Sequence, residues 1–346
     1  MAKRIVAIYD RGIDKNLMQG FDVLEKYGYE LTLVEKTVNE DELAYQNSML
    51  AVEVNGPDGT PINPEVFEYL DDTEIIITHF APVSRRMIEA AKNLKIIATL
   101  RTGMENINME AAKERGIKVI NAPGRAAVAV ADFTVAAMLC EIRNIARTDE
   151  DIKTGGWTKK YPNRTYSDNM CNLKVGLVGF GDIGRKIATR LKGFGTTILA
   201  YDPYCTKESI EAFGCVPVSL DELLEQADFV SLHVRLSPQT QNMFGAAEFA
   251  KMKPTAIFVN AARAGLVDEA AMIDALEQKK IGGAVLDVFR EEPLPVDHPL
   301  RKLKNVTLSA HLAGTDIGTF SGSIKIVADN LEQYFSGGEL KNVVNH

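Results

Sequence analysis

The sequence has few of the residues that mark a secreted or metal-binding protein. Its 346 residues include only four cysteines, and no two of them form a C-x-x-C pair. The N-terminal residues, MAKRIVAIYD, enter a predicted strand without the apolar core of a signal peptide. We therefore expect neither disulfides nor a metal site, and scattered thiols of this kind suit the reducing cytoplasm.

A block of basic residues is also missing. The chain has 39 Lys and Arg against 47 Asp and Glu, a formal net charge of −8. A protein that binds the phosphate backbone needs a basic patch, because its affinity comes from neutralising phosphates. Nucleic acid is therefore not an expected partner.

No apolar run is long enough to cross a membrane. The longest, residues 126–140, contains Asp132 and falls short of the roughly 18 uncharged residues that a membrane-spanning helix needs. Its alanines and valines predict a buried helix. They suit close packing against a sheet or against another subunit, and the sequence does not choose between the two.

Short β-branched runs alternate with helical patterns along the whole chain. This alternation predicts α/β architecture, with parallel sheets built from βαβ units. The first predicted set of strands is 4–9, 31–34, 50–54, 74–78, 95–99 and 118–120. The second set has the spacing of a six-stranded dinucleotide-binding domain: one strand beginning at 174, then 196–201, 229–232, 257–260, 283–288 and 306–308.

The most specific pattern is a glycine fingerprint within residues 175–202, VGLVGFGDIGRKIATRLKGFGTTILAYD. Gly179, Gly181 and Gly184 form G-x-G-x-x-G between a short strand and a helix. These glycines allow a tight turn, close approach of the backbone to a pyrophosphate, and close packing of helix on strand. Glycine-rich turns without a ligand also carry this pattern, but here the strand and the helix both agree with a dinucleotide site.

Asp202 ends the second strand of this unit, 18 positions after Gly184. A carboxylate there accepts hydrogen bonds from both ribose hydroxyls of NAD, whereas the 2′-phosphate of NADP would meet a like charge. The sequence therefore predicts NAD as the cofactor.

Three consecutive strand ends carry side chains that suit hydride transfer. Arg263 lies in FVNAARAGLVD, the next strand runs into the acids of LDVFREEP, and His311 lies in SAHLAGT. A histidine can protonate a carbonyl oxygen, a carboxylate favours its protonated form, and an arginine can hold a substrate carboxylate. The trio predicts chemistry between a nicotinamide and a 2-hydroxy acid.

Each member of the trio also has an ordinary structural interpretation. Arg263 taken singly is a surface arginine, the acids are a solvated pair, and a histidine at a strand end is more often structural than catalytic. The chain has five histidines, of which His79, His298 and His346 lack an obviously catalytic setting. The remaining candidates are His233 and His311.

These motifs resemble those of the D-isomer-specific 2-hydroxyacid dehydrogenase family, relatives of D-lactate, glyoxylate and 3-phosphoglycerate dehydrogenases, over nearly the full length. The matching segments are VGLVGFGDIG with AYDP, FVNAARAGLVDE, AVLDVFREEP and SAHLAG. The resemblance implies that Arg263, Glu292 and His311 are catalytic and that Asp287 bonds the nicotinamide carboxamide. It also implies cofactor contacts, besides those of the three glycines and Asp202, from Asp182, Ile183, His233, Val234, Arg235 and Ala261.

The resemblance also implies the domain organisation. Two doubly wound parallel-sheet domains are expected: a flavodoxin-like substrate-binding domain of residues 1–121 and 305–346, and an inserted Rossmann NAD domain of residues 122–304. Family members are usually homodimers, with the helix at 125–145 and the following arm, including Trp157, at the interface. We therefore expect a homodimer and no membrane partner.

The segment 100–107, LRTGMENI, resembles the family loop whose backbone N–H groups hold the substrate carboxylate. It departs from the family pattern because Arg101 stands where a glycine is usual. We expect Arg101, Thr102 and Gly103 to bind substrate, together with His79 on the loop that usually touches the substrate tail.

Two further departures bear on the substrate. Thr78 and Thr99 stand where phosphoglycerate dehydrogenases carry arginines for the phosphate, and the chain ends before the regulatory domain expected of them. Arg235 stands where the family commonly has proline. It is either an outward arginine or a contact to an anion of the cofactor or substrate. The departures favour a sugar acid, a dicarboxylate or another polar acid, with 3-phosphoglycerate as an alternative.

Two other classes share this fold. Formate dehydrogenases resemble the pattern with glutamine in place of Glu292, which disfavours that activity here. A non-catalytic NAD-sensing scaffold, as in the C-terminal-binding corepressors, would retain all three catalytic residues. The chain lacks a basic localisation tract or disordered tail, so an enzyme is favoured.

Overall fold

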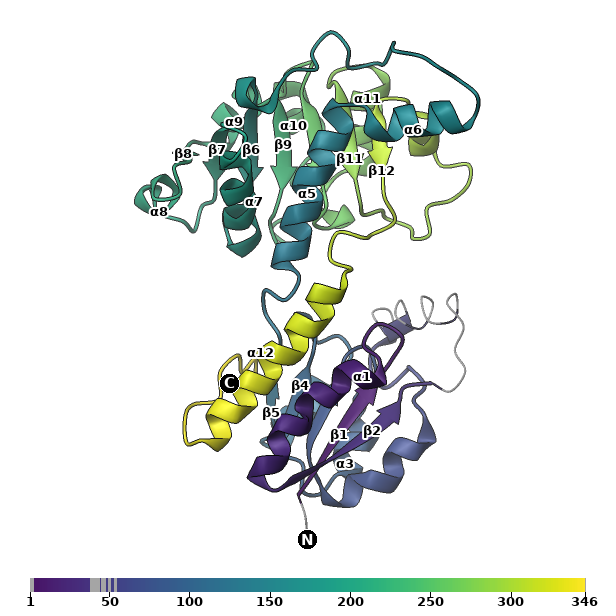
Figure 1. Cartoon of the computed structure of the whole chain (residues 1–346), viewed down its shortest axis with the longest axis vertical. Coiled ribbons are helices and arrows are strands. Elements are labelled where there is room, and N and C mark those ends of the chain that lie inside the picture. Colours follow the sequence, from purple (N-terminus) through teal and green to yellow (C-terminus); the bar gives the residue numbers. More distant parts are fainter. Residues whose placement is uncertain (1–2, 38–43, 45–47, 49–50, 53–54, 346) are drawn as a thin grey trace. The chain divides into compact units, whose positions relative to one another are not determined.

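The computed structural model describes residues 3–37, 44, 48, 51–52 and 55–345, and the chain divides into two compact units (Figure 1). The first unit is Met1–Arg125 with Asp316–His346, and the second is Ala126–Thr315. The second unit extends beyond the expected boundary at residue 304, because strand β12 (Val306–Leu308) pairs with β11 (Gly283–Leu286) of the same sheet.

The first unit contains a five-stranded sheet in which every pairing is parallel. Its strand order is β2-β1-β3-β4-β5, the flavodoxin-like order, in which the chain reverses its direction across the sheet between β1 and β3. The strands are β1 (Lys3–Tyr9), β2 (Tyr29–Glu35), β3 (Thr73–Thr78), β4 (Ile96–Thr99) and β5 (Lys118–Ile120).

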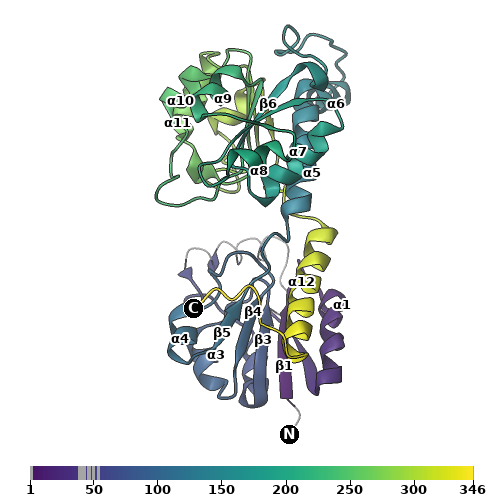
Figure 2. The same cartoon turned by 90° about the vertical axis from the view of Figure 1, so that its left-hand side faces the viewer.

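Helices cover both faces of this sheet (Figure 2). On one face Ile5 and Ala7 pack in a core with α12 (Ile317–Phe335), and on the other Val6 and Ile8 pack in a separate core. Since both faces are buried, the strands read as continuous apolar runs rather than as alternating ones. The other helical segments are α1 (Lys15–Met18) and η1 (Gln19–Tyr27) on the α12 face, and η2 (Pro64–Asp72), α3 (Arg85–Ala90) and α4 (Met109–Glu114) on the opposite face.

One predicted strand of the first set is wrong. Within 50–54, Ala51 and Val52 are helical, and the other three residues lie outside those that the structure describes. A five-residue apolar run cannot be assigned to strand or helix by periodicity alone. The other predicted strands of both sets are confirmed, with ends that differ by at most two residues.

The second unit contains a seven-stranded parallel sheet of order β12-β11-β10-β9-β6-β7-β8. Its other strands are β6 (Lys174–Val178), β7 (Thr197–Tyr201), β8 (Val216–Pro217), β9 (Phe229–Leu232) and β10 (Ile257–Asn260). The prediction of six strands was one short. The missing strand is β8, an edge strand of two residues, one of them a proline, which is too short to show a periodic pattern.

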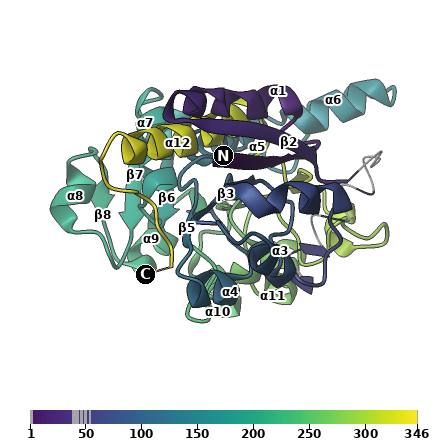
Figure 3. The same ribbon diagram turned by 90° about the horizontal axis from the view of Figure 1, so that it is seen from below.

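Helices α5 (Ala127–Ile142) and α7 (Asp182–Lys192) lie on one face of this sheet, and α9 (Leu220–Gln226), α10 (Ala246–Lys251) and α11 (Glu269–Glu277) on the other (Figure 3). The apolar run at 126–140 is therefore packed on a sheet through residues such as Val135 and Met138. Within the described residues, no helix has the length and apolarity to span a membrane. The short elements are α6 (Ile145–Lys153), α8 (Lys207–Glu211), η3 (Met170–Asn172), η4 (Ala264–Leu266) and η5 (Pro299–Lys302).

Candidate active site

In the glycine turn between β6 and α7, two glycines leave no room for a Cβ beside the neighbouring backbone. Gly179 has φ +98°, and a Cβ there would lie 2.6 Å from the carbonyl oxygen of His233. A Cβ at Gly184 would lie 2.4 Å from the carbonyl oxygen of Gly179. Any larger residue at either position would therefore displace backbone.

Gly181 differs, because a Cβ there would meet nothing within 4 Å among the described residues. It is the N-cap of α7, whose first amides have no intrahelical acceptor and carry the positive end of the helix dipole. An open approach to these amides fits a pyrophosphate, which would pass where a side chain would otherwise project.

Asp202 lies directly after β7, next to this turn. Its Oδ2 accepts a hydrogen bond from the backbone N–H of Phe180 (2.8 Å), and its Oδ1 accepts one from that of Tyr204 (2.8 Å). A cavity of about 400 Å³ lies beside it, within the size range of small-molecule pockets. The cavity is lined by Ala200, Tyr201, Asp202, Cys205, Lys207, Ile210, Pro217, Val218, Ser219 and Glu222. This arrangement can accommodate the nucleoside portion of a dinucleotide.

His233 and Val234 follow β9 and lie against the glycine turn. The backbone N–H of His233 donates to Val178 (2.7 Å), and its Nε2 hydrogen-bonds the hydroxyl of Ser231 (2.8 Å). Burial lowers the pKa of His233 to about 3, so its ring is neutral. The side chain of Arg235 is exposed.

A small apolar cluster lies between the glycine turn and the loops that carry Arg263 and His311. Ile183, in the first turn of α7, packs with Val130, Ala261 and Ala313. Ala261 lies on the loop that carries Arg263, and Ala313 on the loop that carries His311. The structure therefore brings the predicted cofactor turn together with the loops of two predicted catalytic residues. The neighbouring Asp182 is exposed and pairs with Lys186.

Glu292 and His311 form a hydrogen-bonded pair. His311 Nδ1 lies 2.8 Å from Glu292 Oε2, and Glu292 Oε1 accepts the backbone N–H of Phe289 at 2.9 Å. The carboxylate is thus an acceptor on both oxygens, which directs the Nδ1 proton of His311 toward it. The His311 side chain is 49 % exposed, so Nε2 is the nitrogen left for a substrate.

Charges around this pair favour its ionised form. The hydrogen bond to Glu292 raises the pKa of His311, against opposing contributions from burial and Arg263. Burial opposes ionisation of Glu292, but hydrogen bonds from His311 and Phe289 outweigh it and lower the pKa of the carboxyl group. The hydrogen bond to Glu292 therefore favours the protonated imidazole.

Asp287 holds the loop that carries His311. Its carboxylate is fully buried and accepts from the hydroxyl of Ser309 (2.6 Å) and from the backbone N–H groups of Leu312 and Ala313 (2.9 Å each). These contacts bracket His311, which has φ +54°. Asp287 thus positions the histidine, and its contact with the nicotinamide stays a prediction.

Arg263 is held by its backbone while its side chain is exposed. The side chain of Asn260, 2 % exposed, donates to the Arg263 carbonyl and accepts from the Ala262 N–H, both at 3.0 Å. The Arg263 guanidinium contributes to lowering the pKa values of both Glu292 and His311. Its charge therefore acts on the pair.

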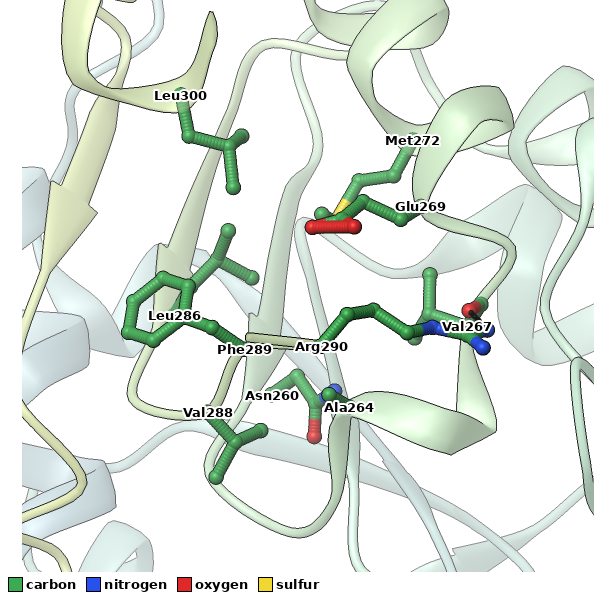
Figure 4. A pocket seen from close by; sticks show the side chains of 10 residues that line it. All are labelled: Asn260, Ala264, Val267, Glu269, Met272, Leu286, Val288, Phe289, Arg290 and Leu300. Carbon is green, nitrogen blue, oxygen red and sulfur yellow. Dashed lines mark hydrogen bonds between the residues drawn. The ribbon is translucent and has the colours of Figure 1, made fainter. Parts of the chain in front are cut away.

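Three supporting residues were not predicted from the sequence: Asn260, Ser309 and Arg290. Figure 4 shows the Arg290 side chain reaching across toward Val267; it donates to the Val267 carbonyl (2.5 Å) and to Asn242. The cavity drawn there is only about 10 Å³, room for about one water. The base of these loops is therefore packed. All three residues lie within the quoted motifs, but nothing in those motifs marked their supporting roles.

The predicted substrate-binding residues lie in the first unit, beyond the ends of β3 and β4. Arg101 is 8 % exposed, with its guanidinium 4.1 Å from the ring centre of Phe80. The Thr102 carbonyl accepts from Asn121 Nδ2 (2.7 Å), and a Cβ on Gly103 would meet the Glu105 carboxylate. His79 is 1 % exposed and pairs with Asp10, a residue that sequence analysis did not consider. His346 lies outside the described residues.

We predict that Glu292→Gln shifts the pH profile of keto-acid reduction to lower pH. If His311 is the general acid, reduction needs its protonated form, so the rate should fall as pH rises through the His311 pKa. Glu292 raises that pKa, and removing its charge lowers it. The alkaline limb of kcat/KM against pH measures the shift. Glu291→Gln, which changes an exposed neighbour, is the matched control, and coincident profiles for both variants would contradict the pairing.

Comparison with known proteins adds a family match. The family model described as "D-isomer specific 2-hydroxyacid dehydrogenase, NAD binding domain" matches residues 135–313, more than half of the chain. The chain is 39 % identical over 283 residues to a D-3-phosphoglycerate dehydrogenase of Methanocaldococcus jannaschii, covering 81 % of this chain and 53 % of that protein. The chain thus spans about half the length of that relative.

A glyoxylate reductase of Korarchaeum cryptofilum is 37 % identical over 287 residues, which cover 82 % of this chain and 86 % of that protein. Among solved structures, D-2-hydroxyisocaproate dehydrogenase superimposes with a TM-score of 0.80 over 99 % of this chain and 100 % of that chain. Its identity is 24 %, so this likeness concerns the fold alone. The predicted fold class is confirmed.

Proposed function

The chain belongs to the D-isomer-specific 2-hydroxyacid dehydrogenase family, and on this premise we propose that it transfers a hydride between NAD and a D-2-hydroxy acid or its 2-keto acid. The observation that carries the proposal is the Glu292–His311 pair at 2.8 Å. It lies in the same unit as Arg263, the glycine turn and Asp202, so one unit holds both an acid–base pair and a dinucleotide site.

The residues divide the chemistry among them. When bound, NAD supplies or takes up the hydride. In reduction, His311 Nε2 donates a proton to the carbonyl oxygen of the keto acid, and in oxidation it accepts that proton from the hydroxyl group. Glu292 keeps the imidazole protonated and oriented, and Arg263 binds the substrate carboxylate. The loops that Asp287 and Asn260 secure keep these groups in place.

Cofactor binding is proposed for the glycine turn and the residues around it. The turn would hold the pyrophosphate and Asp202 the ribose hydroxyls. The remaining proposed contacts come from Asp182, Ile183, His233, Val234, Arg235, Ala261 and Asp287.

A polar acid is the proposed substrate, bound in part by Arg101, Thr102, Gly103 and His79. 3-Phosphoglycerate is the second candidate, because the relative from Methanocaldococcus jannaschii is named D-3-phosphoglycerate dehydrogenase. Two observations weigh against it: Thr78 and Thr99 are fully buried, and Thr78 donates its hydroxyl proton to the Ala81 carbonyl at 2.7 Å. Neither threonine offers the charge that a phosphate needs.

A cytoplasmic homodimer is the proposed state of the protein. Helix α6 has no buried residue. Ile145 and Ile152 on it are 58 % and 48 % exposed, and Trp157 on the following arm is 81 % exposed. Exposed large apolar side chains on one stretch of the chain suit an interface, and a second copy of this chain would cover them.

Turnover of a panel of 2-keto acids with NADH tests the proposed function. We expect NADH oxidation with at least one polar 2-keto acid, and a product of the D configuration on chiral analysis. NADH binding without turnover of any keto acid would instead favour the non-catalytic scaffold. An L product would contradict the proposed D specificity.

A further inference from the structure

A buried Asp–His pair lies at the point where the first sheet reverses its strand order. Asp10 directly follows β1 and His79 directly follows β3, and these strands are neighbours, with β2 on the far side of β1. In open parallel α/β sheets, ligands bind beyond the carboxyl ends of the strands at this switch point. The pair therefore occupies the position where such a sheet offers a binding site.

Hydrogen bonds decide the orientation of the His79 ring. The Asp10 carboxylate is 5 % exposed and accepts the backbone N–H groups of Gly12 (2.9 Å), Ile13 (3.0 Å) and Phe80 (3.2 Å). His79 Nδ1 lies 3.1 Å from both of its oxygens. A carboxylate with three amide donors is ionised, so Nδ1 carries the proton that faces it.

The remaining nitrogen of His79 is then a hydrogen-bond acceptor in the neutral ring. Burial lowers the pKa of His79, and the charges of Arg125 and Arg101 lower it further, against the effect of Asp10. Neutral imidazole with a proton on Nδ1 leaves a lone pair on Nε2. What His79 needs at Nε2 is a donor.

A second acceptor beside His79 is in the same condition. Asn106 is fully buried, and its Nδ2 donates to the carbonyls of His79 (3.2 Å) and Ala81 (3.0 Å), which sets the orientation of the amide. Neither Asn106 Oδ1 nor His79 Nε2 has a hydrogen-bond partner among the described residues. A buried acceptor without a donor is destabilising. Two such acceptors on adjacent loops therefore point to a ligand that donates hydrogen bonds.

A cationic donor belongs to the same group of side chains. The Arg101 guanidinium stacks on Phe80 and lies 3.6 Å from Glu105. The Phe80 ring meets the His79 ring edge-on, with centroids 4.5 Å apart. The Phe80 ring is thus in contact with both the His79 imidazole and the Arg101 guanidinium. We call Asp10, His79, Arg101 and Asn106 the switch-point cluster.

We propose that the switch-point cluster binds hydroxyl groups on the substrate chain beyond C2, so that the substrate is a polyhydroxylated acid such as a sugar acid. The inference rests on the proposed function and narrows its substrate class. A hydroxyl can donate to His79 Nε2 or Asn106 Oδ1 and accept from Arg101. A second carboxylate has no proton for either acceptor, and an alkyl chain satisfies none of the three groups.

Pairs of isosteric keto acids test this specificity. The first pair is hydroxypyruvate and 2-oxobutanoate, and the second is 4-hydroxy-2-oxobutanoate and 2-oxopentanoate. Within each pair a methyl group replaces the hydroxyl group. Oxaloacetate is added as a dicarboxylate. We expect kcat/KM to favour the hydroxylated member of at least one pair by roughly 10- to 150-fold, because a site built to hydrogen-bond a hydroxyl rejects an analogue without it. A preference for oxaloacetate, or no discrimination within either pair, would overturn the inference.

The variant His79→Asn isolates the acceptor. Its amide can still donate toward Asp10, but it places no acceptor at the position of Nε2. We expect the preference within the discriminated pair to fall toward one, mainly through a higher KM for the hydroxylated acid. His298→Asn is the matched control, because His298 also pairs with a carboxylate, that of Glu269 at 3.4 Å, in the second unit. An unchanged preference in His79→Asn would make the pair purely structural.

A measurement on the unaltered protein covers the case in which His79→Asn does not fold. The nitrogen resonance of His79 Nε2, assigned in ¹⁵N-histidine-labelled protein, should move on adding the hydroxylated acid and not on adding its alkyl isostere. Equal responses to both acids would overturn the inference. Failure of the proposed function looks different, because the wild-type protein would then reduce no keto acid at all.

Discussion

Replacing His311 by alanine should lower kcat for keto-acid reduction by roughly 10²- to 10⁴-fold, the usual contribution of a positioned general acid. The variant removes the imidazole that Glu292 holds protonated at 2.8 Å. NADH affinity should stay near that of the wild type, because the glycine turn and Asp202 are untouched. Steady-state kinetics with the best keto acid, together with NADH titration by fluorescence, separate the two quantities.

His298→Ala is the control for this prediction. It removes a histidine that pairs with Glu269 and lies outside the proposed catalytic groups, so kcat should change little. If His311→Ala turned over at the wild-type rate, the histidine would be structural and would have no part in proton transfer.

The second large effect is expected in the choice of cofactor. Wild-type protein should prefer NADH to NADPH, and Asp202→Ser should narrow the ratio of the two kcat/KM values by roughly 10- to 150-fold, the range for one charge-assisted contact. The carboxylate next to the glycine turn would repel a 2′-phosphate, whereas serine would not. The Lys207 side chain lines the same cavity. In the variant its positive charge would no longer be offset by the carboxylate of Asp202.

Asp221→Ser provides the comparison, because Asp221 is an exposed acid paired with Lys251. It lowers the net negative charge by the same amount and should leave the cofactor ratio unchanged. A wild-type preference for NADPH would contradict the prediction. A ratio that moved equally in both variants would attribute the effect to overall charge rather than to Asp202.

Local patterns in the sequence accounted for most of the strands and for the glycine turn. Gly179 and Gly184 could be predicted because they belong to a known glycine pattern. The requirement at Gly184 is local, since a Cβ there would meet the Gly179 carbonyl, whereas Gly179 approaches the backbone of His233 at the end of the adjacent strand. The two failures among the strands were also local. The two-residue strand β8 and the short apolar run at 50–54 are too short for periodicity to separate strand from helix.

By itself, therefore, the sequence determined the βαβ order and the glycine turn with its terminal acid, and it predicted an arginine, acids and a histidine on successive strand ends; the family resemblance singled out Glu292 among the acids. Only the tertiary structure decided what holds them. Asp287 binds the loop of His311, and Asp10 pairs with a histidine 69 positions away. The reason is physical: a strand end has a recognisable spacing along the chain, but a buried polar side chain is satisfied by whichever partner the fold brings within about 3 Å.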